Sequence, residues 1–344
     1  MPRIGVDATA VSPDGKGHAR TQRKLVEALA SLDRFEVVAY VRTPQAASTL
    51  EGIDTVVVGS GKAIAWEQIG MRRAVRRLDL LVTLGDRLPV GAESRIVVWL
   101  FELPTHRIAE NRRVEAGWYQ RGSDLLTAAT WRRSLSRASR VVTGSHATAD
   151  ELGMGSPVVY PGLDDGFGPG PGRPGRFLFH LASADPRDNT RSVLDAFARL
   201  ETDAELLVGG DLGRLEATLR AQASNGVRFL GRVSDEELVS LYRGAAAYVD
   251  ATLYEGFGYQ VLEAMACGAP VVASALTSIP EVVGDAGILC DPRDPDAIAG
   301  ALERVLGEPG TADAMRERGI AQASRFTWQR TADSFGVILD DLLA

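Results

Sequence analysis

This chain is poor in cysteine, in lysine and in long apolar runs. Its two cysteines, Cys267 and Cys290, are too few for a disulfide framework and do not have the spacing of zinc ligands. No window approaches the roughly 20 apolar residues of a membrane span, and the first residues do not have the pattern of a secretory signal. A reducing, cytoplasmic location is therefore expected.

The charge balance excludes a class of partner. The 344 residues carry a net charge of −7, and the arginines are spread over many segments, so nucleic acid is not an expected partner. The apolar share of 45% and the charged share of 24% indicate a soluble globular chain long enough for two domains. Three lysines beside many arginines and alanines suggest a bacterium with a GC-rich genome. The sequence carries no signal of oligomeric state.

Short apolar runs alternate with longer amphipathic runs along the whole chain. Runs rich in Val, Ile and Leu, separated by helices, are typical of parallel sheets covered on both faces. The pattern therefore predicts an α/β protein of two doubly wound units. The expected strands are 3–8, 35–41, 54–58, 79–84, 95–101, 140–144, 157–160, 177–182, 205–209, 227–230, 246–251, 270–273 and 287–290.

A segment dominated by glycine and proline, 161–175, separates the two halves and cannot hold regular structure. We predict an N-terminal domain over 1–165, a linker over 166–176, a C-terminal domain over 177–327 and a final helix over 328–344. Ligands of open α/β sheets lie beyond the carboxyl ends of the strands. A ligand is therefore expected in a cleft between the two domains.

The stretch Tyr254–Ser274 indicates the chemistry. Gly256 and Gly258 permit a tight turn before a helix over 259–267, which Gly268 ends. Glu255 lies in the turn and Glu263 lies inside the helix, roughly 7 Å along its axis. A diphosphate at the positive amino end of this helix would have a carboxylate toward each end of the ligand. The stretch therefore predicts binding of a nucleoside diphosphate sugar.

These residues also carry a family resemblance. Glu255 and Glu263, the following Ala-Cys-Gly-Ala-Pro-Val-Val-Ala-Ser run and Pro280-Glu-Val-Val-Gly resemble the signature of retaining glycosyltransferase family 4. The resemblance implies the GT-B fold, in which two Rossmann-like domains face each other across a cleft and a C-terminal helix crosses back to the N-terminal domain. It also implies sugar transfer to an acceptor hydroxyl with retained configuration and no metal or other cofactor. Asp294-Pro-Asp296 superficially matches a metal motif, but acids are expected where a helix opens.

The resemblance assigns a set of donor-binding positions. A guanidinium suits a diphosphate, so Arg187 is the expected phosphate partner. Asp188 replaces the usual lysine, and we expect it to point away or to meet Lys16, Arg20 or Arg191; another cation is then expected in place of the lysine. The assigned donor residues are Glu263, Glu255, Gly256, Phe257, Gly258, Tyr259, Arg187, Arg232, Val233, Gly15 and Gly17.

The acceptor side departs from the family pattern. Phe101 occupies the place of the usual histidine at the end of a strand, whereas Glu102 keeps the acidic position and His106 lies four residues further on. The candidates for contact with the acceptor are Glu102, His106 and Asp86, and the catalytic candidates are Glu255, Arg187 and His106.

Alternative interpretations remain open. The departures at Asp188 and Phe101 are compatible with a non-catalytic or weakly active nucleotide-sugar-binding protein, and a GT-B epimerase or phosphorylase is a nearer alternative. A nicotinamide dehydrogenase is excluded because no expected strand is followed by Gly-x-Gly-x-x-Gly. The expected helix 62–78 clusters its basic residues over Arg72–Arg77, which suits either weak contact with an anionic membrane or, as we favour, an exposed face of a helix packed on the sheet.

Overall fold

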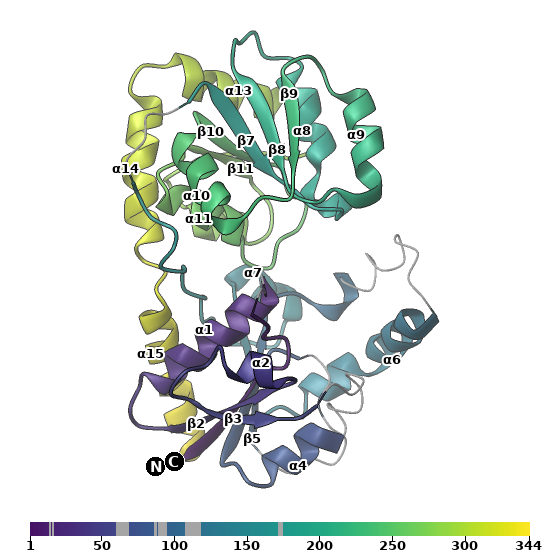
Figure 1. Ribbon diagram of the computed structural model, residues 1–344, viewed down its shortest axis with the longest axis vertical. Helices are drawn as coiled ribbons and strands as arrows, with labels where there is room; N and C mark the ends of the chain where they lie inside the picture. Colours follow the sequence, from purple (N-terminus) through teal and green to yellow (C-terminus); the bar gives the residue numbers. More distant parts are fainter. Residues whose placement is uncertain are drawn as a thin grey trace. The chain divides into compact units, whose positions relative to one another are not determined.

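A computed structural model describes residues 1–13, 15, 17–59, 69–85, 88, 95–106, 118–170 and 175–344, without the side chains of 118–121 and 123. The described chain forms two compact units (Figure 1). The first unit comprises Met1–Gly162 together with Thr327–Ala344, and the second comprises Leu163–Phe326. Among the described residues, no helix is long and apolar enough to cross a bilayer.

The first unit is built on a six-stranded sheet in the order β3-β2-β1-β4-β5-β6, in which every pairing is parallel. Its strands are β1 (Arg3–Asp7), β2 (Glu36–Val41), β3 (Asp54–Val57), β4 (Leu80–Thr83), β5 (Arg95–Leu100) and β6 (Arg140–Thr143). Its helices, within the described ranges, are α1 (His18–Ala30), α2 (Pro44–Ala47), α4 (Met71–Val75), α6 (Trp118–Leu135), α7 (His146–Leu152) and α15 (Trp328–Leu343).

The second unit has a six-stranded parallel sheet in the order β12-β11-β10-β7-β8-β9. Its strands are β7 (Phe177–Leu181), β8 (Glu205–Gly209), β9 (Val227–Gly231), β10 (Ala247–Asp250), β11 (Val271–Ser274) and β12 (Ile288–Cys290). Its helices are α8 (Thr190–Phe197), α9 (Glu216–Gln222), α10 (Asp235–Gly244), α11 (Tyr259–Ala266), α12 (Ile279–Val283), α13 (Pro295–Gly307) and α14 (Thr311–Ala323), with short 3-10 turns η2 (Pro186–Asp188) and η3 (Gly213–Leu215).

The two sheets have the same topology. When the strands of each unit are numbered from one to six, both orders read 3-2-1-4-5-6. The strand order reverses between the first and the fourth strand, which are β1 and β4 in one unit and β7 and β10 in the other. Ligands of doubly wound folds bind at this switch point, beyond the carboxyl ends of the two strands.

The predicted doubly wound α/β architecture is confirmed, and twelve of the thirteen expected strands are present to within about two residues at each end. The expected strand 157–160 is wrong, because this segment forms only an isolated bridge between Thr143 and Val158. Pro157 has no N–H for a ladder, which restricts pairing there. Of the expected helix 62–78, the structure gives α4 over Met71–Val75, and residues 60–68 lie outside the described ranges.

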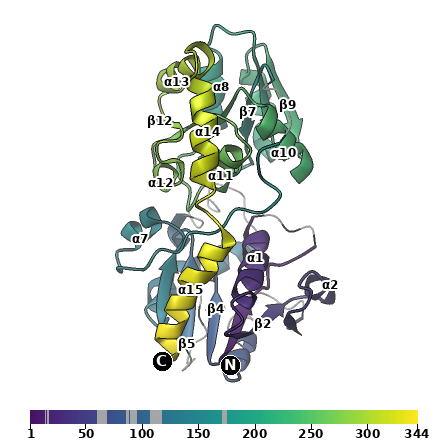
Figure 2. The same ribbon diagram turned by 90° about the vertical axis from the view of Figure 1, so that its left-hand side faces the viewer.

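The largely aliphatic core of the first unit contains an aromatic cluster that includes the last helix of the chain. Trp99 on β5 is fully buried, and its ring lies 5.0 Å from that of Phe335 and 6.4 Å from that of Trp328, measured between centroids. Both partners belong to α15, which Figure 2 shows in yellow beside α1 in purple. Thr331 also donates a hydrogen bond from its hydroxyl to the Tyr160 carbonyl at 2.8 Å. The return of the C-terminal helix to the N-terminal unit is thus confirmed.

The core of the second unit covers both faces of its sheet, one packed with aliphatic side chains and the other with aromatic rings. On one face, buried Val, Leu and Ala side chains of the strands pack on α8, α9 and α13. On the other face lie Phe179, Tyr242 and Tyr248, whose rings contact one another at centroid distances of 5.2–5.9 Å. Burial raises the pKa of both tyrosines well above the ordinary value, so both hydroxyls are protonated.

Candidate functional site

The switch point of the second unit brings together the loops that follow β7 and β10. The Leu253 amide donates to the Arg187 carbonyl at 2.8 Å, and the buried Thr252 hydroxyl lies 3.2 Å from the same oxygen. The loop that carries the predicted phosphate ligand is therefore tied to the loop that carries Glu255. This contact lies within a single unit and follows from the strand order.

The amino end of α11 is suited to an anion. Gly258 is its N-cap with φ 103°, no side chain caps the helix, and its first turn contains no acidic residue. A Cβ at Gly258 would lie 2.7 Å from Ile279 Cδ1, so glycine is required here by backbone conformation and by space. The helix dipole and the amides of the first turn thus face the predicted phosphate position without a competing carboxylate of the same turn.

Glu255 is held through its backbone. Its amide donates to Thr277 Oγ1 at 3.1 Å, and its carbonyl accepts from Ser278 Oγ at 2.8 Å. Both partners lie in the loop between β11 and α12. The side chain of Glu255 is half-buried, as is expected for a residue at the rim of a binding site.

Glu263 lies one turn into α11 and is only 8% exposed. Its charge contributes to the raised pKa of Tyr242 and of Tyr248, so its carboxylate lies on the side of the helix that faces these rings. Carboxylates are rarely buried to this extent unless polar groups surround them. A carboxylate in this place can accept hydrogen bonds from a ligand's hydroxyls strongly, because little water competes.

Arg187 is oriented by a residue that the sequence analysis did not single out. Its Nε and Nη2 atoms each lie 2.7 Å from Asp185 Oδ2, and its amide donates to Asp185 Oδ1 at 2.8 Å. Its guanidinium carbon also lies 5.8 Å from the centre of the Tyr254 ring. These contacts fix a mostly buried cation at the switch point, where a phosphate requires one.

Asp188 does not contact Arg191, which is one of the predicted alternatives. Its carboxylate accepts from the amide and the hydroxyl of Ser183, within its own loop, and Arg191 lies instead 3.8 Å from Asp195. Burial raises the pKa of Asp188, and the Ser183 hydrogen bonds oppose that shift. The acid therefore serves to close the loop after β7. Lys16, one of the predicted partners of Asp188, lies outside the described residues.

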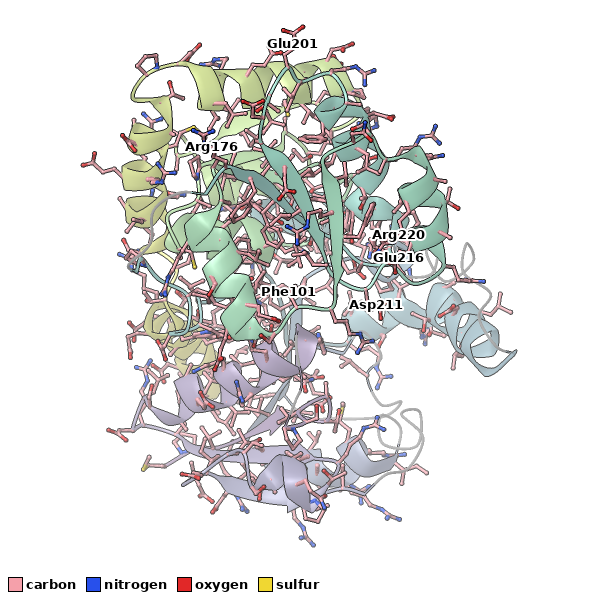
Figure 3. The ribbon with its side chains drawn as sticks, turned by 45° about the horizontal axis from the view of Figure 1, so that its top comes forward. Phe101, Arg176, Glu201, Asp211, Glu216 and Arg220 are labelled. Atoms are coloured by element: carbon pink, nitrogen blue, oxygen red, sulfur yellow. The ribbon has the colours of Figure 1, made fainter. Side chains whose placement is uncertain are left out.

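Two further donor candidates, Arg232 and Val233, follow β9 at the same edge of the sheet. Arg232 is exposed, and its Nε and Nη2 atoms lie 3.0 and 2.8 Å from Asp211 Oδ2. This pair lowers the pKa of Asp211. Within the second unit, Figure 3 places Asp211 at the opposite end of the sheet from Glu201 and Arg176.

A hollow of about 470 Å³ lies at that opposite end. It is lined by Arg176, Glu201, Asp203 and neighbouring residues, which precede the strands. Since ligands of this topology bind beyond the carboxyl ends of the strands, the hollow is distinct from the candidate donor site.

Buried polar side chains of β7 and β10 lie next to the switch point. His180 in β7 donates from Nδ1 to the Val249 carbonyl at 2.9 Å and accepts at Nε2 from the Thr190 hydroxyl at 3.1 Å. Burial lowers its pKa to about 4, so the ring is neutral. At the end of β10, Asp250 accepts from the Thr252 amide at 3.0 Å, and burial raises its pKa to about 6. These hydrogen bonds fix the backbone where β7 and β10 end.

In the first unit, the loop between β1 and α1 keeps its predicted glycines. A Cβ at Gly15 would lie 2.5 Å from the Ala19 Cβ, and Gly17 is the N-cap of α1 with φ 55° and no side-chain cap. This end of α1 also has no acidic residue in its first turn, as is the case for α11. Asp86, predicted to contact the acceptor, lies outside the described residues.

His106 contacts Glu151 of α7 through Nε2, and Glu102 is half-buried near the end of β5. Phe101, which replaces the family histidine, packs 4.7 Å from the Trp99 ring, and its carbonyl accepts from the Thr148 hydroxyl at 2.7 Å. A Cβ at Gly144 would lie 2.6 Å from this ring. Phe101 is therefore half-buried and packs against the core of the first unit.

Asp294, part of the apparent metal motif, is the N-cap of α13, where it accepts from the amides of Asp296 and Ala297 at 2.9 and 3.2 Å. In the described ranges, no group of three or more His, Cys, Asp or Glu side chains has the arrangement of a metal site.

No motif in the sequence marks four further residues of the site, which are Asp185, Thr252, Thr277 and Ser278. Asp185 lies two residues before Arg187, a spacing that could have indicated an Asx turn. Nothing in the sequence indicated that Thr277 and Ser278 would contact Glu255, because the contact spans more than 20 residues.

Comparison with known proteins agrees with this geometry. Residues 175–308 match the family model described as Glycosyl transferases group 1. O-antigen chain mannosyltransferase B of Escherichia coli is 38% identical over 162 residues, which are 44% of this chain and 42% of that protein. The MMP alpha-(1->4)-mannosyltransferase of Mycolicibacterium hassiacum is 33% identical over 223 residues, 61% of this chain and 53% of that protein. The chain thus matches about half, or less, of the length of these relatives.

Solved structures match the whole chain. Sucrose-phosphate synthase from Thermosynechococcus elongatus has a TM-score of 0.75 at 20% identity, with 99% of both chains covered. The Anabaena protein HepE, in complex with UDP and glucose, has a TM-score of 0.76 at 17% identity, with 99% of this chain and 100% of that chain covered. At such identities the likeness shows the fold. The resemblance seen in the sequence is confirmed: residues 175–308 carry the group 1 glycosyltransferase pattern, in a chain that has the GT-B fold.

Proposed function

We propose that this protein is a glycosyltransferase that moves a hexose from a nucleoside diphosphate sugar to a hydroxyl of a glycan, lipid or natural-product acceptor, with retention of anomeric configuration. The observation that carries the proposal is the switch point of the second unit, where hydrogen bonds from Leu253 and Thr252 to the Arg187 carbonyl join the Arg187 loop to the loop that carries Glu255 and leads into α11. Mannose is the first sugar to test, since the relatives from Escherichia coli and Mycolicibacterium hassiacum are named mannosyltransferases.

In this proposal, the barrier lies in expelling a diphosphate while the sugar gains positive charge. Arg187 and the amides at the start of α11 stabilise the leaving charge. Both are fixed before the donor arrives, so little reorganisation is needed during the reaction. Because these groups supply positive charge, the proposal includes no metal and no other cofactor. Activity that persists in excess EDTA tests this part.

The two glutamates take different roles. Glu263 accepts hydrogen bonds from the ribose hydroxyls in its buried position, and Glu255 holds sugar hydroxyls near the anomeric carbon. Glu263 therefore contributes to binding of any nucleotide, whereas Glu255 contributes where the sugar reacts.

The acceptor is proposed to meet the first unit at Glu102 and His106, which follow β5. A separate hollow of about 540 Å³ beside α4 is lined by Arg3, Arg73, Arg76 and Arg77, with Tyr40 at its wall. Burial raises the pKa of Tyr40, and the charges of Arg3 and Arg77 oppose that shift. Met71, Ala74 and Val75 are buried, as the favoured packing of this helix on the sheet requires, and weak contact of the exposed arginines with an anionic membrane stays the second alternative. Cosedimentation with anionic vesicles, absent with zwitterionic ones, tests this contact.

The central experiment separates the two glutamates. A thermal-shift panel of UDP, GDP, dTDP and ADP identifies the base, and calorimetry and product assays then follow with the matching donor. We expect Glu263→Ala to weaken nucleotide binding about 10- to 100-fold, because a charge-assisted hydrogen bond is lost. Glu255→Ala should lower kcat about 100-fold and change nucleotide affinity less than about threefold.

Glu303→Ala is the matched control, because this exposed glutamate on α13 lines the hollow at the far end of the sheet. It should behave as wild type. Wild-type nucleotide affinity and turnover in both Glu255→Ala and Glu263→Ala would overturn the site, and release of free sugar phosphate or an epimer would favour a phosphorylase or an epimerase.

A further inference from the structure

The loop after β11 contacts the loop after β10 at the backbone of Glu255. Thr277 Oγ1 accepts from the Glu255 amide at 3.1 Å, and Ser278 Oγ donates to the Glu255 carbonyl at 2.8 Å. The peptide groups on both sides of the Glu255 Cα are thus held by two consecutive side chains. A residue held in this way has little freedom in either flanking torsion angle.

Thr277 adopts a conformation that disfavours its own side chain. Its φ of 53° lies in the left-handed region, where a β-branched residue is an outlier. Among the described non-glycine residues, only Asp33 and Asn189 also have a positive φ, and Asp and Asn tolerate this conformation. Such strain persists where surrounding contacts enforce it, and it gathers at functional sites.

Ser278 is also diverted from its usual local role. It occupies the N-cap of α12, where serine commonly accepts from an amide of the first turn, yet its side chain makes no cap hydrogen bond. The fully buried hydroxyl donates across to Glu255 instead.

The next residue makes a second junction between the same loops. A Cβ at Gly258 would lie 2.7 Å from Ile279 Cδ1, so Ile279 packs against the turn that opens α11. The loop after β11 therefore meets the loop after β10 both at Glu255 and at the N-cap of α11. These are the two places that the proposed function assigns to the sugar and to the diphosphate.

We propose that Thr277 and Ser278 are positioning residues, which fix the Glu255 peptide relative to the amino end of α11 and so set where the donor sugar lies with respect to its leaving group. The catalytic part of this inference rests on the proposed function. Displacement of a positioned group by about 1 Å costs roughly 100-fold in rate. The strain at Thr277 is retained because its hydroxyl is needed at this point.

The test compares Thr277→Val, which keeps the shape and removes the hydroxyl, with Thr277→Ser, which keeps the hydroxyl. For Thr277→Val we expect kcat to fall about 10- to 100-fold while KM for the donor changes less than about threefold. Thr277→Ser should recover kcat to within about threefold of wild type. Thr311→Val is the matched control, because the Thr311 hydroxyl bonds to Glu308 at the start of α14. It should leave kcat unchanged.

Two further measurements separate positioning from stability. Thr277→Gly relieves the left-handed strain, so we expect its melting temperature to equal or exceed that of wild type while kcat falls as in Thr277→Val. Hydrogen–deuterium exchange of the peptide that contains the Glu255 amide should be faster in Thr277→Val than in wild type.

The outcomes are distinct. Wild-type kcat in Thr277→Val, equal loss in the valine and serine variants, or unchanged exchange at Glu255 would each overturn the positioning role. If the wild-type protein releases no nucleoside diphosphate from any donor, the proposed function is overturned, and the exchange measurement alone then decides whether Thr277 holds Glu255.

Discussion

The two units share one topology and differ in what they bury. In the first unit the buried Trp99 packs against the buried Phe335 and against Phe101 and Trp328, which are half-buried. The second unit buries His180, Asp250, Glu263 and several hydroxyl groups beside its tyrosines, next to the carboxyl ends of β7 and β10. Both switch points are polar, because Asp7 and Thr83 of the first unit are also buried and hydrogen-bonded to each other at the ends of β1 and β4. The second unit differs in that its buried Thr252 contacts Arg187 and its buried Glu263 is itself a predicted donor residue.

This difference separates the residues that determine the fold from those that determine the site. An apolar core requires only side chains of suitable volume, and it tolerates Phe101 where relatives of the resembled family have histidine. A buried polar edge requires each donor and acceptor to be satisfied, so single substitutions there change charge as well as shape. The pattern of the family model agrees, because it matches 175–308 and not the first unit.

The largest expected effect tests the aromatic core. Phe335→Ala removes a fully buried ring that packs on Trp99, and it should lower the free energy of unfolding of the first unit by about 3–5 kcal/mol. All five tryptophans belong to the first unit, so tryptophan fluorescence during urea unfolding reports on that unit. Val337→Ala, at a 69% exposed position of the same helix, is the control and should change little. An equal effect of both variants would contradict the packing of α15.

The next effect tests the polar edge through activity. Arg187→Ala removes the cation beside the proposed diphosphate position and should lower kcat/KM about 100- to 1000-fold. Arg191→Ala removes an exposed arginine four residues further on, which lies 3.8 Å from Asp195, and should stay within about twofold of wild type. Steady-state kinetics with the identified donor checks both. Similar losses in the two variants would indicate a general charge effect and not a site at the switch point.

The effect that is smallest per step, about 1.4 kcal/mol for one pH unit, tests the buried groups through pH. The pKa of His180 is about 4 in the folded protein and 6.5 in the unfolded chain, so the unfolded chain binds more protons between these values. Relative to His180→Asn, wild type should therefore lose stability as pH falls from 6.5 to 4, by about 1.4 kcal/mol per pH unit. Urea unfolding followed by circular dichroism at several pH values measures this difference.

Asp250 should change the free energy of unfolding with pH in the direction opposite to that of His180. Its folded pKa of about 6 exceeds the ordinary 3.8, so its contribution is present at low pH and is lost as pH rises toward 6. Relative to Asp250→Asn, wild type should therefore lose stability as pH rises from 4 to 6. The two slopes oppose each other in wild type, and parallel slopes for the two variants would contradict the burial of one of them.

Much of the fold could be predicted because periodicity is a local property. The alternation of apolar runs gave twelve strands and the α/β class, and Ser234 with Glu237, three residues apart, forms a local capping box at α10. The 157–160 strand failed because pairing depends on a neighbour and not on the run itself. At the site, the glutamates and glycines of 254–274 were visible since they are close in sequence.

By itself the sequence determined which residues follow which strand, and so which chemical groups a parallel sheet would present at its carboxyl edge. Only the tertiary structure decided that β7 and β10 are neighbours, that Asp185 orients Arg187, and that Thr277 and Ser278 hold Glu255. The physical reason is that hydrogen bonds and ion pairs between loops depend on atomic positions set by packing of the whole sheet, whereas helix and strand patterns depend on residues a few positions apart.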